Sequence, residues 1–207
     1  MKQLTQRYLV SDLELRLSKS KPSTDLELEY DQMAQWIDQA RDFVTSSYLS
    51  ASKTIDSSVV MEMKELTPYE AEEMFFINLG VIPLDIKGNR GIVYVKDSEG
   101  RYILGQSIQN KRMISKLSFA KPMFCNIVYT LTGTSLILDG YNSVDDLQFD
   151  VGIVHSEISR EKDPDDRYYL LPSTEEEIVS LAEEIGLRQM NGQSYYDLNS
   201  DGIGNDI

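Results

Sequence analysis

The fold is decided by one apolar stripe in "EYDQMAQWIDQARDFVTSSYL", residues 29–49. Its apolar residues recur at steps of three and four, which is the spacing of one face of an α-helix. The stripe and the two residues that widen it are Tyr30, Met33, Ile37, Ala40, Val44, Tyr48, Trp36 and Phe43. The stretch therefore predicts a long helix whose apolar face must be covered by other elements.

A second helix is predicted before it. "LTQRYLVSDLELRLSK", residues 4–19, places apolar residues at loosely helical spacing, and Pro22 breaks the chain before the long helix begins. These apolar residues are Leu4, Tyr8, Leu13 and Leu17. We expect the two helices to be neighbours.

A third helix is predicted within "YYLLPSTEEEIVSLAEEIGLRQM", residues 168–190. Ser173 with Glu176 fits a capping box, and Thr174 with Glu177 fits one equally well. Gly186 is expected to end the helix or to follow its end closely. The predicted buried stripe is Ile178, Leu181, Ala182 and Ile185.

The middle of the chain has the patterns of β-strands. "GIVYVKDSEGRYIL" (residues 91–104) predicts two strands around a turn at Asp97–Gly100, and "NIVYTLTGTSLIL" (residues 126–138) repeats this form with a turn near Thr132–Gly133. In "LQFDVGIV" (residues 147–154) the alternation places Leu147, Phe149, Val151 and Ile153 on one face.

The predicted fold class is therefore α+β. An N-terminal helical pair and a C-terminal helix form a small bundle, with an inserted antiparallel β-sheet and a polar C-terminal tail. The expected parts are N-terminal helices at 1–55, a β region at 56–156, a loop at 157–172, the C-terminal helix at 173–190 and the tail at 191–207.

The charge is concentrated in the last third. The net charge is −14, and residues 139–207 hold 17 acidic and 4 basic residues, whereas residues 1–138 hold 17 and 16. An acidic surface repels nucleic acid phosphates, although simple solubility explains the same charge. Cys125 is the only cysteine, so an internal disulfide is excluded.

The sequence carries no recognised catalytic pattern. The single histidine, His155, has no nucleophile or metal partner signposted beside it, and HExxH, CxxC, GxSxG and P-loop patterns do not occur. We therefore expect neither an enzyme nor an obligate cofactor.

Two kinds of residue are predicted to make contacts with other chains. Tyrosines are common at protein interfaces, although the pairs near the C-terminal helix equally suit packing of its ends. The basic stretch "NKRMISKLSFAK" (residues 110–121) suits DNA, an acidic neighbour or a solvated face. The candidate interface residues are Lys111, Arg112, Lys116, Tyr168, Tyr169, Tyr195 and Tyr196.

The tail "YYDLNSDGIGNDI", residues 195–207, resembles the start of a calcium-binding loop. Such a loop takes oxygen ligands at positions 1, 3, 5 and 9, with glycine at position 6. The matching residues are Asp197, Asn199, Asp201 and Asn205, with Gly202 at position 6. Position 12 would lie beyond Ile207, so the final ligand would be the terminal carboxylate or a neighbour's acid. Asp, Asn and Gly equally suit a tail of turns.

The order of these elements resembles a family, the head–tail connector proteins of tailed bacteriophages. The resemblance is carried by "TDLELEYDQMAQWIDQAR", "VYTLTGTSLIL" and "YYLLPSTEEEIVSLAEEIGL". Three other segments, "RYLVSDLELRLSKSKPSTDLE", "VIPLDIKGNRGIVYV" and "LSFAKPMFCNIVYTLTGTSLILDG", look most like ring proteins of crAss-like phages of Bacteroides. The resemblance covers roughly residues 1–190, and its motifs are structural rather than catalytic.

The resemblance implies a structural subunit of a ring, a dodecamer, that connects the portal to other neck or tail proteins. DNA would pass through it without sequence recognition, and strand edges would pair with neighbouring subunits. The expected location is the virion neck after synthesis in the cytoplasm of the host bacterium, with no membrane partner. The alternative is a calcium-dependent interaction module on a cell or virion surface.

Overall fold

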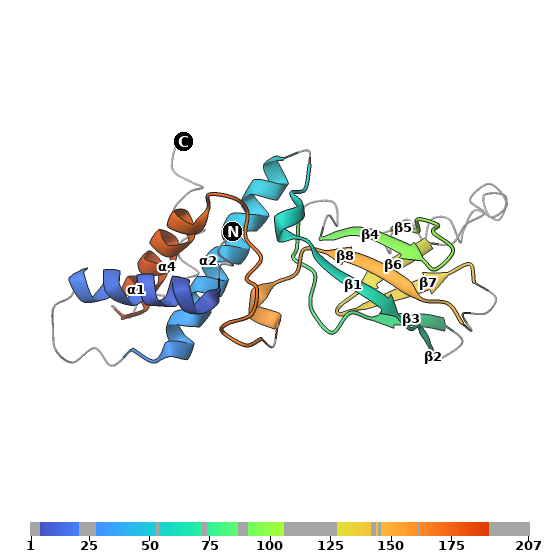
Figure 1. Cartoon of the computed structure of the whole chain (residues 1–207), viewed down its shortest axis with the longest axis horizontal. Coiled ribbons are helices and arrows are strands. Elements are labelled where there is room, and N and C mark those ends of the chain that lie inside the picture. The colour runs from blue at the N-terminus through green and yellow to red at the C-terminus, as the bar shows by residue number, and fades with distance from the viewer. Residues whose placement is uncertain are drawn as a thin grey trace, which may run out of the picture. The chain divides into compact units, whose positions relative to one another are not determined.

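The computed structural model describes residues 5–20, 28–52, 54–71, 74–86, 91–105, 128–141, 144, 146–160 and 162–190. The chain divides into two compact units. A helical unit comprises Met1–Lys53 and Glu161–Ile207, and a β unit comprises Thr54–Arg160. The β unit is thus inserted into the helical unit, and the predicted α+β class is confirmed (Figure 1).

The helical unit is built from α1 (Gln6–Ser20), α2 (Tyr30–Ala51) and α4 (Glu175–Met190). Each helix contacts the other two, so the apolar stripes meet in one core. The core of this unit is Leu9, Val10, Leu13, Leu17, Met33, Ala34, Trp36, Ile37, Ala40, Val44, Tyr168, Leu170, Ile178, Val179, Ala182 and Ile185. Helical periodicity, together with the capping and proline signals, therefore located all three helices.

Three aromatic residues were assigned to the wrong face. Tyr8, Phe43 and Tyr48 are exposed, although helical spacing placed them on the buried stripes. Tyr48 instead donates its hydroxyl to Glu177 Oε2 at 3.2 Å. A bundle of three helices covers a limited arc of each one, and these aromatics lie outside that arc.

The prediction that Gly186 ends the last helix was wrong. α4 continues to Met190, and Gly186 lies buried inside it. A Cβ at this position would lie 2.6 Å from Cζ3 of Trp36. Glycine is therefore present because α2 and α4 approach closely, and not because the helix ends there.

Of the two predicted capping boxes, the position of the α4 start agrees with the one formed by Thr174 and Glu177. Because the helix begins at Glu175, Thr174 precedes it, and the three glutamates at 175–177 lie in the first turn as expected. The Thr174 hydroxyl donates to the carbonyl of Leu171 at 2.8 Å. Ser173 adopts φ 64, outside the helix.

The β unit contains two groups of strands. One has the order β1 (Met61–Leu66), β8 (Phe149–Ile153) and β4 (Ile92–Asp97). The other has the order β2 (Tyr69–Ala71), β3 (Met74–Asn78), β7 (Ser135–Asp139), β6 (Val128–Thr132) and β5 (Leu104–Gly105). Two short 3₁₀ turns, η1 (Ser57–Val59) and η2 (Glu157–Ser159), flank these strands.

The predicted turns are confirmed. Gly100 donates its N–H to the Asp97 carbonyl at 2.9 Å and has φ 84, and Gly133 between β6 and β7 has φ 58. Glycine adopts this left-handed backbone without strain. The two hairpin patterns therefore identified where the chain reverses.

Backbone pairing joins the two groups of strands on one side, and a short stretch of chain joins them on the other. On one side, Ile103 donates its N–H to the Val95 carbonyl at 2.9 Å, and Lys96 forms a bridge with Tyr102, so residues 101–105 link β4 to β6. On the other side, β1 pairs with β8 and β2 pairs with β3, while only two residues separate β1 from β2. The order of neighbouring strands is therefore β1, β8, β4, β5, β6, β7, β3 and β2, and residues 67–68 connect β2 back to β1 along the chain.

The corner between β1 and β2 is made by a bulge. The register with β8 shifts between Met63 and Leu66, and Glu65 adopts φ 55. The Glu65 N–H bonds to Asp150 Oδ1 at 3.1 Å, which holds the bent backbone. Bulges bend a strand, and this bend lets the two sheets enclose one interior as a small, partly closed barrel.

The β region was predicted to be antiparallel, but one pair of strands is parallel. β5 pairs in parallel with β6, with Leu104 opposite Val128. Parallel neighbours need a long connection, and the 22 residues from 106 to 127 supply it. A hairpin rule that considers adjacent strands does not anticipate this pair.

One side of each strand faces the barrel interior. Phe149, Val151 and Ile153 are fully buried, which confirms the alternation predicted for β8. The interior cluster is Ile77, Leu79, Ile92, Val95, Ile103, Leu136, Leu138, Val144, Phe149, Val151 and Ile153. Since both groups of strands contribute, the interior is one packed core.

Candidate functional site

The first candidate surface lies on the outside of the barrel where residues 101–105 run beside β4. Tyr102 is 71% exposed and Leu104 is 68% exposed. Two residues apart on an extended segment, they project to the same face. Tyr94 of β4 lies beside them, with its ring 6.5 Å from that of Tyr102 in an edge-to-face arrangement. Tyr94, Tyr102 and Leu104 are called the β5 wall below.

This wall stands on a rigid base. A Cβ at Gly152 of β8 would lie 2.3 Å from the ring of Tyr94, so that ring lies directly on the β8 backbone. The turn beside the wall is held by Asp97, whose side chain is fully buried. Asp97 Oδ2 accepts from Arg101 Nε at 2.7 Å and from the Tyr141 hydroxyl at 3.2 Å. The exposed side chains are therefore presented by a fixed backbone.

The pKa of the Asp97 carboxyl is lowered. Burial acts to raise it, but hydrogen bonds from the Arg101 backbone and side chain, and the charge of Arg101, outweigh burial. The carboxylate is thus the form that the turn stabilises.

The second candidate surface lies on the outside of β2 and β3. Tyr69 is 47% exposed and stacks on Phe76, with ring centroids 5.5 Å apart. Tyr69 pairs with Phe76 and Ala71 pairs with Met74, so these four side chains share one face. The interior of the barrel lies on the other face, where Ile77 is fully buried. Tyr69, Ala71, Met74 and Phe76 are called the β2 wall below.

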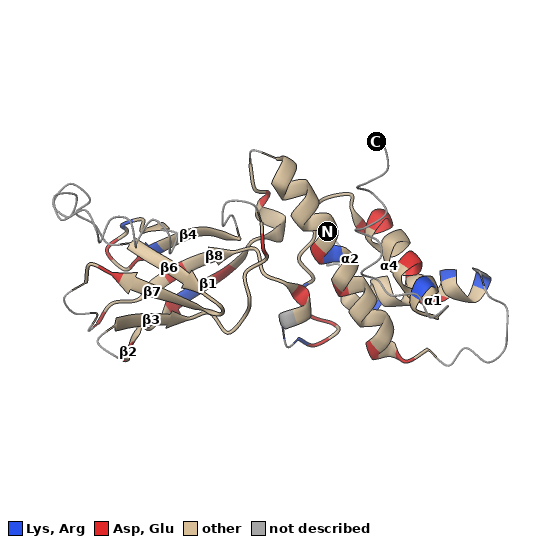
Figure 2. Cartoon of the chain, turned by 180° about the vertical axis from the view of Figure 1, so that it is seen from behind, with Lys and Arg blue, Asp and Glu red and all other residues tan. Residues whose placement is uncertain are grey.

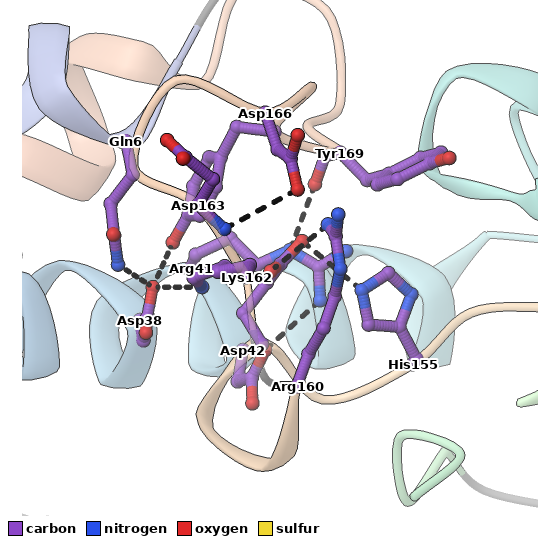
Figure 3. A network of polar contacts seen from close by, with 12 residues as sticks. Gln6, Asp38, Arg41, Asp42, His155, Arg160, Lys162, Asp163, Asp166 and Tyr169 are labelled. Atoms are coloured by element: carbon purple, nitrogen blue, oxygen red, sulfur yellow. Dashed lines mark hydrogen bonds and ion pairs between the residues drawn. The ribbon is translucent and has the colours of Figure 1, made fainter. Parts of the chain in front are cut away.

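The helical unit contains a buried polar cluster centred on Asp38 of α2. Figure 3 shows Gln6 of α1 and Lys162 of the returning chain pointing at this carboxylate. Asp38 Oδ1 accepts from Gln6 Nε2 at 2.8 Å, from Lys162 Nζ at 2.8 Å and from the Tyr168 hydroxyl at 2.6 Å. Burial raises the pKa of Asp38 even though Lys162, Tyr168 and Gln6 act to lower it. The cluster ties α1, α2 and the returning segment together.

A second buried contact secures the same segment. Arg41 of α2 is fully buried, and its Nε donates to the Tyr169 carbonyl at 2.8 Å. Its Nη1 lies 2.9 Å from Asp42 Oδ1. Arg7 at the start of α1 donates its N–H to the Pro164 carbonyl at 3.2 Å. The two separate parts of the helical unit are thus joined by polar as well as apolar contacts.

The structure separates the two tyrosines of the pair at 168–169. Tyr168 is in the core and bonds Asp38, which is the packing alternative considered for this pair. Tyr169 is half-buried, with the Arg167 guanidinium 4.8 Å from its ring centroid. A contact role for Tyr169 stays a prediction.

The loop predicted at 157–172 is only partly exposed. Asp163, Asp165 and Asp166 are at the surface, but Glu157 is buried and lies 3.2 Å from His155 Nε2. Arg160 Nη1 is 3.7 Å from the other oxygen of Glu157. The only histidine is therefore fully buried, with the carboxylate of Glu157 beside it.

Several acids of the last third form ion pairs within the chain. Glu176 of α4 lies 2.7 Å from Arg16 Nη2 of α1, and Glu184 lies 2.8 Å from Arg188. Figure 2 shows the acidic positions along α4 and the basic positions on α1. These pairs lessen the charge that α4 presents, and repulsion of nucleic acid phosphates by the acidic last third stays a prediction.

The remaining predicted site residues lie outside the described residues. They are Lys111, Arg112, Lys116, Tyr195, Tyr196, Asp197, Asn199, Asp201 and Asn205. Among the residues that the structure does describe, no group of three His, Cys, Asp or Glu could hold a metal ion.

Sequence reasoning missed both walls and the Asp38 cluster. The alternation in residues 91–104 assigns neighbouring side chains to opposite faces of the strands. Because apolar residues occur on both faces, the pattern does not show which of them are exposed. Lys162 is 124 residues from Asp38, and nothing in either local sequence signals the other. Asp38 directly follows Ile37 of the buried stripe, which is the one available hint that it is buried.

A scan against protein-family models finds no matching family, and a search of curated proteins finds no match. Of the helices in the described part of the chain, none has the length and apolar character needed to cross a membrane.

Proposed function

We propose that this protein is a structural subunit of the neck of a tailed bacteriophage. Copies form a ring that connects the portal to tail components and surrounds the DNA channel. The observation that carries this proposal is the inserted architecture, in which the β unit Thr54–Arg160 interrupts a three-helix unit. Helix, helix, strands and helix in that order are the features on which the resemblance to head–tail connectors rests.

The construction of the helical unit supports a mechanical role. Its two chain segments are joined by the core and by Asp38, whose three buried partners come from α1 and from the segment that returns from the β unit. Fully satisfied buried polar networks rigidify a fold and specify one arrangement. A subunit that transmits load between portal and tail needs such a joint.

The outer surface of the β unit supports association with other chains. The exposed side chains of the β5 wall and the β2 wall lie on a fixed barrel. Contiguous exposed apolar groups on a soluble domain mark interaction surfaces. A ring subunit has a use for two such surfaces, because it contacts a neighbour on each side.

The proposal is tested with the full chain and the portal protein of the same phage. The chain is measured alone and mixed with portal by light scattering coupled to size exclusion, and the mixture is imaged by electron cryomicroscopy. We expect a ring of this protein coaxial with the portal. The portal of an unrelated tailed phage serves as the control. A chain that leaves the mass and image of its own portal unchanged refutes the proposal.

A further inference from the structure

We draw no further inference here: the strongest candidate, the exposed aromatic surface that the β5 wall and the β2 wall form on the outside of the β unit, carries none, because nothing in the described part of the structure shows what covers either wall.

Discussion

Replacing Gly186 by alanine tests the close approach of α2 and α4. In an exposed helix interior this change stabilises by about 1 kcal/mol, because alanine is the better helix former. Here the new Cβ would lie 2.6, 2.7 and 3.2 Å from Cζ3, Cε3 and Cη2 of Trp36. Trp36 is fully buried, and its Nε1 donates to Gln189 Oε1 at 2.8 Å, so the ring is held in place.

The expected sign is therefore the reverse of the helix propensity. Overpacking a well-packed core costs about 1–3 kcal/mol. At contacts below 3 Å the cost should lie in the upper part of that range. After the helix gain is subtracted, we expect Gly186→Ala to lower the free energy of unfolding by about 1–2 kcal/mol.

Trp36 provides the measurement. It is the only tryptophan, so its fluorescence in a urea titration reports the helical unit specifically. This matters because a chain of two compact units need not unfold in one step. A Gly186→Ala protein that is as stable as the wild type, or more stable, refutes the close packing of these helices.

A double-mutant cycle assigns the cause. Trp36→Phe removes part of the indole ring that meets the new methyl group, and it is destabilising by itself. Far-UV circular dichroism replaces fluorescence for all four proteins in the cycle. In the Trp36→Phe background we expect Gly186→Ala to become neutral or stabilising, with a coupling of at least about 1 kcal/mol. Additive effects would show that the new methyl group at residue 186 does not clash with the indole ring of Trp36.

Two further predictions concern buried carboxylates. Asp38→Ala leaves the buried Lys162 ammonium without its 2.8 Å carboxylate partner, and we expect a loss of about 3–5 kcal/mol in urea unfolding; a loss below about 1 kcal/mol would contradict a structural role. The folded-state pKa of the Asp97 carboxyl lies below its ordinary value of 3.8, so its contribution to stability is present above that value and is lost as the pH falls through the folded pKa. Below about pH 4, the free energy of unfolding should therefore fall less steeply with decreasing pH for Asp97→Asn than for the wild type. Equal slopes in the two proteins would count against a stabilising role for the Asp97 carboxylate.

The helices were predictable because their apolar residues have a period that fits one structure. It was harder to predict which residues of each helix pack against other elements. Tyr8 and Phe43 satisfy helical spacing but lie outside the covered arc, because the number of neighbouring helices decides that arc. Gly186 has the local signature of a helix end, and only the proximity of Trp36 explains it.

The barrel was not predictable in the same way. "MEMKEL", which forms β1, is rich in residues that favour helices, so its pairing with β8 decides its conformation. The closing corner depends on Glu65 at φ 55, a backbone angle that a sequence pattern assigns to glycine or asparagine. The buried Asp38 cluster likewise depends on a partner 124 residues away.

Closure of the barrel changes how a ring could be held together. An open sheet would offer free strand edges, and neighbours could add strands through backbone hydrogen bonds. In this β unit, residues 101–105 connect β4 to β6 by backbone pairing, so this side has strand neighbours already, whereas β1 and β2 each pair with one strand only. Association through the side of residues 101–105 would then depend on outward side chains and on charge. It should be sensitive to serine substitution of Tyr102 and to salt, whereas strand addition at β1 or β2 would be sensitive chiefly to proline in that strand.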